Sequence, residues 1–337
     1  MSDYSTDAGR RVRQAADLEG VLGPFAQKVE RLAAEMGRVV VGQQTMVHRL
    51  LVGLFTGGHV LLEGAPGLAK TLTVSTLAKA LSLRFKRIQF TPDLLPTDLV
   101  GTLIYNPRDG RFEVKTGPVF ANIVLADEIN RSPAKVQSAL LEAMQEKQVT
   151  LGDETYPLPQ PFLVLATQNP IDQQGTYPLP EAQLDRFMLK VHVDYPTRDE
   201  ELKILKMSAE TPYEVRPQLS GTDVMEIRSL VRRVYLSERL ENYIVDLVGA
   251  TRNPEAYKLP ELKKYIEFGA SPRATIALAA AARAAAFIAG RSHVSPDDLK
   301  SLAADVLNHR IILRYEAEAD GLDARKIVET VMEKLPI

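Results

Sequence analysis

The chain has 337 residues, of which 45% are hydrophobic and 25% charged, and its formal net charge is −2 at pH 7. This length suits about two domains, and the composition is that of an ordinary globular protein. A nearly neutral charge excludes a global basic field for nucleic acid or anionic membranes, although it leaves a local basic patch open. Cysteine is absent, which excludes disulfides and thiolate metal sites, and the five histidines lack metal-ligand spacing.

Targeting and membrane signals are missing from the sequence. The N-terminus lacks the basic and apolar regions of a signal peptide, and the most apolar stretch, 277–289, is too short to span a membrane and contains Arg283. We therefore expect a cytoplasmic protein without membrane insertion. Residues 1–20 are polar, and we expect them to form a flexible tail.

Hydrophobic periodicity predicts the order of the elements. Helical patterns cover Pro24 to about Met36 and the residues after Gln43, and strand-like apolar runs then alternate with helices. This alternation predicts an α/β domain over 21–194, in which helices cover both faces of a parallel sheet. The strand-like runs are 60–62, 87–90, 123–126 and 162–166, and helices at 71–81 and 134–147 lie among them.

Two segments interrupt the alternation, and the pattern changes near residue 195. Residues 102–115, around an Asp-Gly turn, and residues 148–158 are typical of β-hairpins, either decorative loops or functional inserts. From 195 to 337 only helical patterns are visible, so we expect a smaller all-helical domain.

The segment Gly-Ala-Pro-Gly-Leu-Ala-Lys-Thr at 64–71 follows an apolar run and is typical of a phosphate-binding P-loop. Lys70 would reach the β/γ-phosphates, and the Thr71 hydroxyl would ligate Mg²⁺. The second glycine of the common pattern is replaced by Ala69, whose backbone conformation must suit an L-residue. A chance strand–turn–helix is the alternative. The candidate nucleotide-binding residues here are Gly64, Ala65, Pro66, Gly67, Leu68, Ala69, Lys70, Thr71 and Leu72.

Two carboxylates end the strand-like run at 122–126, an arrangement that is known in P-loop ATPases as the Walker B motif. Asp127 would hold Mg²⁺, and Glu128 would orient and deprotonate the attacking water. The alternative is an acidic turn after a core strand. Since the carboxyl ends of parallel strands open on one crevice, we expect both side chains near Lys70.

Three further polar residues are candidates for the same chemistry. Asn169 follows the apolar run at 162–166 and could bond the γ-phosphate or the water, or be a generic strand-end Asn. Arg186 could be an arginine finger for a neighbouring subunit, or a salt-bridge partner. Arg273 sits in the first turn of a helix capped by Ser271, where only a bound anion would favour a cation over a solvated Arg.

These motifs, in this order, resemble an AAA+ ATPase over nearly all of 25–335, and within that superfamily the MoxR group of the helix-2-insert clade. The P-loop with Ala69, the Asp-Glu-Ile-Asn-Arg segment at 127–131, Ala-Thr-Gln-Asn-Pro at 166–170 and Leu-Pro-Glu-Ala-Gln-Leu-Asp-Arg-Phe at 179–187 carry the resemblance. The two hairpins fall where this clade carries its helix-2 insert and pre-sensor-1 hairpin.

The resemblance implies a fold, cofactors and partners. The fold is an AAA+ core followed by an all-α lid, with ATP and Mg²⁺ as cofactors. Arg273 would be sensor 2, Arg186 the finger and Arg131 a second trans-acting candidate, which requires a ring, expected to be a hexamer. Family members are chaperone-like remodellers that often act with proteins carrying a von Willebrand factor A domain. Residues near adenine would be Val41, Gly42 and Gln43.

The function we expect is ATP hydrolysis coupled to remodelling or maturation of a protein partner, without nucleic acid. A nucleic-acid motor of the same clade is the alternative, but the tip of the second hairpin, 152–154, is acidic and suits phosphates poorly. A metal-chelatase motor subunit is a third reading, for which the chain offers no separate metal or tetrapyrrole site.

Overall fold

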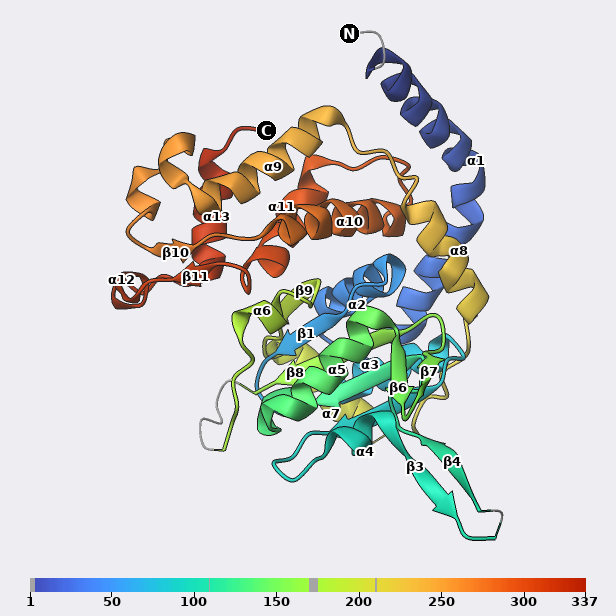
Figure 1. Cartoon of the computed structure of the whole chain (residues 1–337). Coiled ribbons are helices and arrows are strands. Elements are labelled where there is room, and N and C mark those ends of the chain that lie inside the picture. Colours follow the sequence, from blue (N-terminus) through green and yellow to red (C-terminus); the bar gives the residue numbers. More distant parts are fainter. Residues whose placement is uncertain (1–3, 109, 170–174, 210) are drawn as a thin grey trace.

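The computed structural model describes residues 4–108, 110–169, 175–209 and 211–337, with side chains described from Leu18 onward. Its centre is a five-stranded parallel sheet in the order β2-β5-β8-β1-β9 (Figure 1). The α/β fold predicted from the sequence is confirmed, although β9 was not foreseen. The strands are β1 (Val60–Glu63), β2 (Phe85–Gln89), β5 (Ile123–Asp127), β8 (Leu163–Gln168) and β9 (Leu189–His192).

Side chains of the central strands alternate between two hydrophobic cores, as the pleat of a strand requires. In β5, Ile123 and Leu125 face one core, whereas Val124 and Ala126 face the other. Both faces of the sheet are therefore apolar, and helices cover each of them. The first core contains α2 (Gln44–Thr56) and α3 (Lys70–Ala80), and the second contains α4 (Pro96–Val100) and α5 (Ala134–Glu146).

Both predicted hairpins are confirmed. The first pairs β3 (Gly101–Asn106) with β4 (Arg111–Thr116), and the second pairs β6 (Gln148–Leu151) with β7 (Glu154–Pro157). The first hairpin projects from the sheet domain (Figure 1), and its exposed Tyr105 and Phe112 rings face each other across the strands at 5.4 Å. Asp109 of the predicted turn lies outside the described residues.

The prediction of a flexible tail over 1–20 was wrong, because helix α1 runs from Tyr4 to Gly37 and passes through Pro24. Its buried residues recur at alternating steps of four and three, which places them on one face of a helix. This stripe starts well before Pro24, at which the predicted helix began. The members of the stripe are Leu18, Leu22, Phe25, Val29, Leu32 and Met36.

The C-terminal domain is mostly helical, but the prediction that it is entirely so was wrong. A short antiparallel pair, β10 (Ile266–Phe268) and β11 (Ile312–Leu313), ties two of its connections together. Strands of three and two residues carry too little alternation to be visible in a sequence. The helices are α9 (Glu238–Arg252), α10 (Pro272–Ile288), α11 (Pro296–Leu307), α12 (Tyr315–Ala319) and α13 (Ala324–Lys334).

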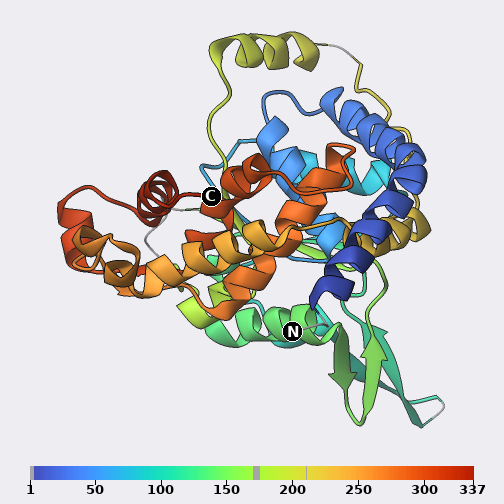
Figure 2. The same cartoon turned by 90° about the horizontal axis from the view of Figure 1, so that it is seen from above.

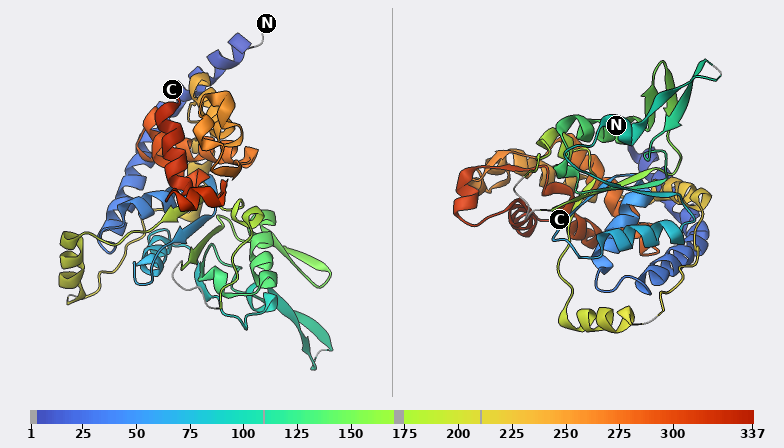
Figure 3. Two further views of the ribbon diagram at one scale, coloured as in Figure 1. Left: turned by 90° about the vertical axis from the view of Figure 1, so that its left-hand side faces the viewer. Right: turned by 90° about the horizontal axis from the view of Figure 1, so that it is seen from below.

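Two helices connect the domains and behave differently. Helix α7 (Arg198–Ser208) buries none of its residues and stands away from the body (Figures 2 and 3). Helix α8 (Gly221–Val231) returns to α1 and α2, where Lys28 Nζ lies 2.6 Å from Asp223 Oδ1. Residues C-terminal to the predicted boundary at 195 therefore pack on the first domain.

The second domain rests on the first through one continuous hydrophobic core. Helix α10 packs on α2, and the core that contains α2 and α3 extends through α9, α11 and α13. None of the described helices is both long and apolar enough to span a membrane. The remaining short elements are η1 (Ile129–Arg131), α6 (Glu181–Leu184), η2 (Pro254–Tyr257) and η3 (Pro260–Leu262).

Candidate active site

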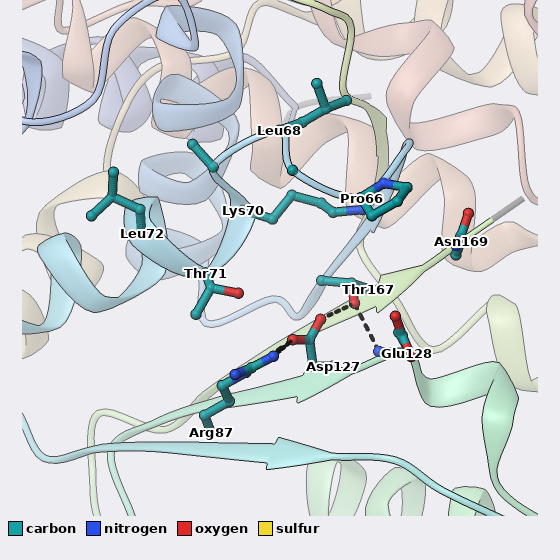
Figure 4. A pocket seen from close by; sticks show the side chains of 12 residues that line it. Pro66, Leu68, Lys70, Thr71, Leu72, Arg87, Asp127, Glu128, Thr167 and Asn169 are labelled. Carbon is teal, nitrogen blue, oxygen red and sulfur yellow. Dashed lines mark hydrogen bonds and ion pairs between the residues drawn. The ribbon is translucent and has the colours of Figure 1, made fainter. Parts of the chain in front are cut away.

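A cavity of about 330 Å³ lies at the carboxyl ends of β1, β5 and β8 (Figure 4). The turn after β1, the carboxylates after β5 and the polar exit of β8 meet there because parallel strands end at the same edge of a sheet. The cavity brings together most of the predicted P-loop with both carboxylates and Asn169. The lining residues are Pro66, Gly67, Leu68, Ala69, Lys70, Thr71, Leu72, Arg87, Asp127, Glu128, Thr167 and Asn169.

The turn between β1 and α3, which is the predicted P-loop, has two constrained backbone positions. Gly64 approaches Val193 so closely that a Cβ would lie 2.7 Å from the Val193 carbonyl oxygen. Ala69 has φ +57°, a left-handed conformation in which an alanine is strained by about 1–2 kcal/mol. The site thus keeps a backbone that favours glycine at a position where this chain carries alanine.

Lys70 reaches back over the loop. Its Nζ donates to the Gly64 carbonyl oxygen at 2.6 Å. Burial lowers the pKa of Lys70, while the carboxylates of Asp127, Glu128 and Glu63 act to raise it. A phosphate entering the loop would replace that carbonyl as the partner of a partly desolvated ammonium group.

The two carboxylates are held by β8 and β2. The Thr167 hydroxyl donates to Asp127 Oδ1 at 2.6 Å and accepts the Glu128 N–H at 2.8 Å. Arg87 Nε and Nη2 both donate to Asp127 Oδ2, at 2.9 and 2.5 Å. Gln89 Nε2 donates to Glu128 Oε2 at 3.0 Å (Figure 4 shows the Asp127 contacts).

Sequence reasoning missed Arg87, Gln89 and Thr167 as site residues. The signal for Thr167 was present, since it occupies the exit of the strand that ends at the predicted Asn169. Arg87 and Gln89 lie on β2, whose place beside β5 is decided by the pairing of the sheet. Strand order is set by packing and cannot be read from the sequence of β2 alone.

The residues predicted near adenine lie outside this cavity. Gly42 and Gln43 line a separate hollow of about 560 Å³ with residues that follow β9. Gln43 Nε2 donates to the Asp194 carbonyl oxygen at 3.1 Å, and a side chain at Gly42 would meet Glu200. Val41 is not among the residues that line either hollow.

Comparisons with known proteins agree with this layout. The model of the ATPase family associated with various cellular activities (AAA) matches residues 59–189, and that of an AAA lid domain matches 262–331. The sequence is 48% identical to chaperone MoxR1 of Mycobacterium tuberculosis, over 99% of this chain and 90% of that protein. It is 43% identical to the uncharacterized protein YeaC of Bacillus subtilis, over 95% of this chain and 97% of that protein.

A solved structure agrees as well. The crystal structure of a candidate ATPase from Cytophaga hutchinsonii matches with a TM-score of 0.89 and 56% identity, over 97% of this chain and 98% of that one. The chain belongs to the MoxR family of AAA+ ATPases. As a family member it is an ATPase.

In this MoxR-family ATPase, Arg186 and Arg273 lie together but away from the P-loop. Both line a hollow of about 280 Å³ with Gly57, Gly58 and Lys147. Since the two glycines precede β1 and the predicted P-loop follows it, the arginines are at the opposite end of that strand from the cavity lined by Lys70 and Asp127.

Asp185, the residue before Arg186, connects the core to three residues of the lid. Its Oδ1 accepts from Arg310 Nε at 2.7 Å, and its Oδ2 accepts from the Ser271 hydroxyl at 3.1 Å and lies 3.8 Å from Arg273 Nη1. Arg186 Nη1 donates to the Leu141 carbonyl oxygen at 3.1 Å. The contact with Asp185 therefore fixes Arg273 against the core, whereas Arg186 is held by the core helix α5.

Arg131, the second candidate for a trans-acting arginine, lies apart from Arg186 and Arg273. Its Nη1 is 3.3 Å from Glu128 Oε2 in the same chain, so it stands beside the P-loop cavity. Within one chain, the structure thus groups Arg131 with the carboxylates and Arg186 with Arg273.

Proposed function

We propose that this MoxR-family ATPase couples Mg²⁺-dependent ATP hydrolysis to the remodelling of a partner protein. The observation that carries the proposal is the convergence of the loop at 64–71, two carboxylates and Asn169 on one cavity. Its relative from Mycobacterium tuberculosis is named a chaperone, which supports the coupling to a protein client.

The cavity residues divide the chemistry among them. The backbone N–H groups of the loop and Lys70 bind the phosphates. Glu128 takes the proton of the attacking water, which Asn169 helps to orient. Thr71 and Asp127 offer the hydroxyl and carboxylate oxygens that suit Mg²⁺, with phosphate and water completing its shell. Within the described ranges, no group of three or more His, Cys, Asp or Glu side chains could hold a metal ion unaided.

We place Val41, Gly42 and Gln43 near adenine. The support for this is the hollow that Gly42 and Gln43 line. Gly64 packs against Val193, one residue before Asp194, whose carbonyl accepts from Gln43, so this hollow and the P-loop share a wall. A nucleotide could extend from one to the other.

The position of the two arginines supports a proposal of ring assembly. Arg186 and Arg273 lie at the end of β1 that is remote from the P-loop of their own chain. Lys147 lines the same hollow, so among its described lining residues three cations outnumber the one carboxylate, that of Asp185, and the excess positive charge suits the phosphates of an ATP bound by a neighbour. A closed ring of identical subunits, proposed as a hexamer, gives every site such a neighbour.

The client contacts the hairpins in this proposal. The β3–β4 hairpin projects from the body and exposes Tyr105 and Phe112, by 53% and 67%, as an apolar pair near its tip. Such a pair suits an apolar segment of a polypeptide, and the acidic tip of the second hairpin, 152–154, suits phosphates poorly, so no nucleic acid is expected. The partner that the family resemblance suggests carries a von Willebrand factor A domain. A cytoplasmic location stays a prediction.

The experiment uses Glu128→Gln, which keeps the phosphate-binding loop and loses the base. This variant should bind ATP with Mg²⁺ and stall before hydrolysis, whereas Lys70→Ala should fail to bind. Captured from a native extract with ATP, Glu128→Gln should retain a protein with a von Willebrand factor A domain and release it with ADP. Retention of nuclease-sensitive nucleic acid in its place would contradict the proposal, as would equal capture by Lys70→Ala.

A further inference from the structure

The guanidinium of Arg87 stands inside the P-loop cavity, directly against the carboxylate assigned to Mg²⁺ (Figure 4). It comes from β2, and both Nε and Nη2 donate to one oxygen of Asp127, at 2.9 and 2.5 Å. The Arg87 side chain is 50% exposed, while that of Asp127 is 12% exposed. A half-exposed cation thus meets a nearly buried anion.

The other oxygen of Asp127 is held as well. The Thr167 hydroxyl donates to Oδ1 at 2.6 Å, and the same hydroxyl accepts the Glu128 N–H. The orientation of the carboxylate is therefore set by Thr167, on a buried strand, and does not depend on Arg87. Oδ2 is the oxygen left for exchange, and Arg87 occupies it.

Arg87 also has a second partner to which it can retreat. Its Nη2 lies 2.9 Å from Gln89 Oε1, two residues along the same strand and on the same face. If the contact with Oδ2 is lost, the guanidinium can keep this bond and a solvated position. Removal from Asp127 therefore costs less than it would for a buried arginine.

We infer that Arg87 is a resident counter-ion of the metal site: it neutralises Asp127 until a metal–nucleotide complex binds, and it then yields Oδ2. The inference rests on the proposed assignment of Thr71 and Asp127 to Mg²⁺. In metal-free nucleotide binding, Arg87 screens Asp127 from the phosphates. With the metal present, a divalent ion takes over that screening and the guanidinium becomes redundant.

Arg87 therefore sets how strongly nucleotide binding depends on the metal. Loss of its charge should weaken the metal-free complex and leave the metal-bound complex nearly unchanged. By linkage, loss of the Arg87 charge should also raise, by the same factor, the affinity of the metal for the nucleotide complex relative to its affinity for the nucleotide-free chain. Because Arg87 is half exposed, we expect a factor of roughly three to ten.

The test is a titration of the purified full chain with a fluorescent ADP analogue, in EDTA and over a Mg²⁺ series. The measured quantity is the ratio of the two dissociation constants, metal-free over metal-saturated. Arg87→Gln should raise this ratio roughly three- to tenfold, and Arg87→Lys, which keeps the charge, should raise it less. Lys86→Gln is the matched control: it removes the same charge from the adjacent exposed residue of β2, which faces the other side.

The outcomes separate this inference from the proposed function. A ratio in Arg87→Gln equal to that of the wild type and of Lys86→Gln would overturn the role of Arg87 and leave the nucleotide site standing. A wild-type chain that binds no nucleotide with or without Mg²⁺ would instead remove the proposed site. A lower ratio in Arg87→Gln would mean that Arg87 assists the metal, and would also overturn the inference.

Discussion

An assembly made only of Arg186→Ala chains should lose ATP hydrolysis, and mixing it with Glu128→Gln should restore activity. Each variant lacks one half of the site we propose between subunits. Arg186→Ala supplies an intact P-loop and Glu128, while Glu128→Gln supplies an intact Arg186 to its neighbour. Only a site that combines the two chains contains every catalytic group.

The length of β1 shows how far Arg186 is from the P-loop of its own chain, and so how much rate its loss should cost. The hollow that contains Arg186 and the P-loop cavity lie at opposite ends of the strand Val60–Glu63. Four residues of strand span about 13 Å, several times the length of a charge-assisted hydrogen bond. Action within one chain is therefore excluded in this arrangement. By analogy with other arginine fingers, each site without one should slow by about 10³–10⁵.

The assay is steady-state phosphate release from each variant alone and from an equal mixture. Random assembly places a Glu128→Gln neighbour in the required position at about a quarter of the sites, so about a quarter of the wild-type rate should return. Assembly of both variants is checked by the mass of the particles with ATP. Arg84→Ala, an exposed arginine before β2, serves as a control that should keep full activity.

Two results would refute the reasoning. Activity of Arg186→Ala within tenfold of the wild type would show that this arginine is no finger. A mixture that stays inactive, although mixed assemblies of normal mass form, would show that Arg186 does not act across the interface. In that case Arg131, which lies beside Glu128 of its own chain, would remain as the second candidate for a trans-acting arginine.

Three further changes test the packing. Ala69→Gly relieves a left-handed φ of +57° and should raise the free energy of unfolding by about 0.5–1 kcal/mol in urea titrations, with hydrolysis unchanged. Arg310→Met breaks a buried contact with Asp185 and should cost about 3 kcal/mol, while exposed Arg232→Met should cost under 0.5 kcal/mol. Burial lowers the pKa of His59 to about 4, so the unfolded chain, titrating near 6.5, takes up a proton first. The contribution of His59 to the free energy of unfolding should be fully present above pH 6.5 and fall by up to about 3 kcal/mol towards pH 4. His48 and His309 also have lowered pKa values and add to the fall, so His59→Gln should reduce it in urea midpoints across that range without abolishing it.

Local patterns sufficed for much of this protein. The loop at 64–71, the strand that ends in Asp127 and the segment before Asn169 are each continuous in sequence, so their residue types reveal strand, turn and polar exit. That parallel strands end at a common edge then predicts the cavity. The two hairpins were visible for the same reason, since turn residues separate short alternating runs.

Errors arose where a local signal was outweighed by packing. Pro24 is typical of a helix start, yet the stripe through Leu18 and Leu22 gains enough burial to carry α1 through it. The pair β10–β11 exists because two distant segments meet, and its two- and three-residue strands have no pattern of their own.

The sequence by itself predicted the chemistry, through a candidate phosphate loop and two carboxylates, and it determined the family to which the chain belongs. Only the tertiary structure decided the neighbourhoods, because these depend on strand order and domain docking. It put Arg87 against Asp127 by pairing β2 with β5. It also put Arg273 beside Arg186, far from the P-loop, by seating α10 of the lid on α2. Contacts between segments far apart in the chain follow from which apolar faces bury one another, and no single segment encodes that choice.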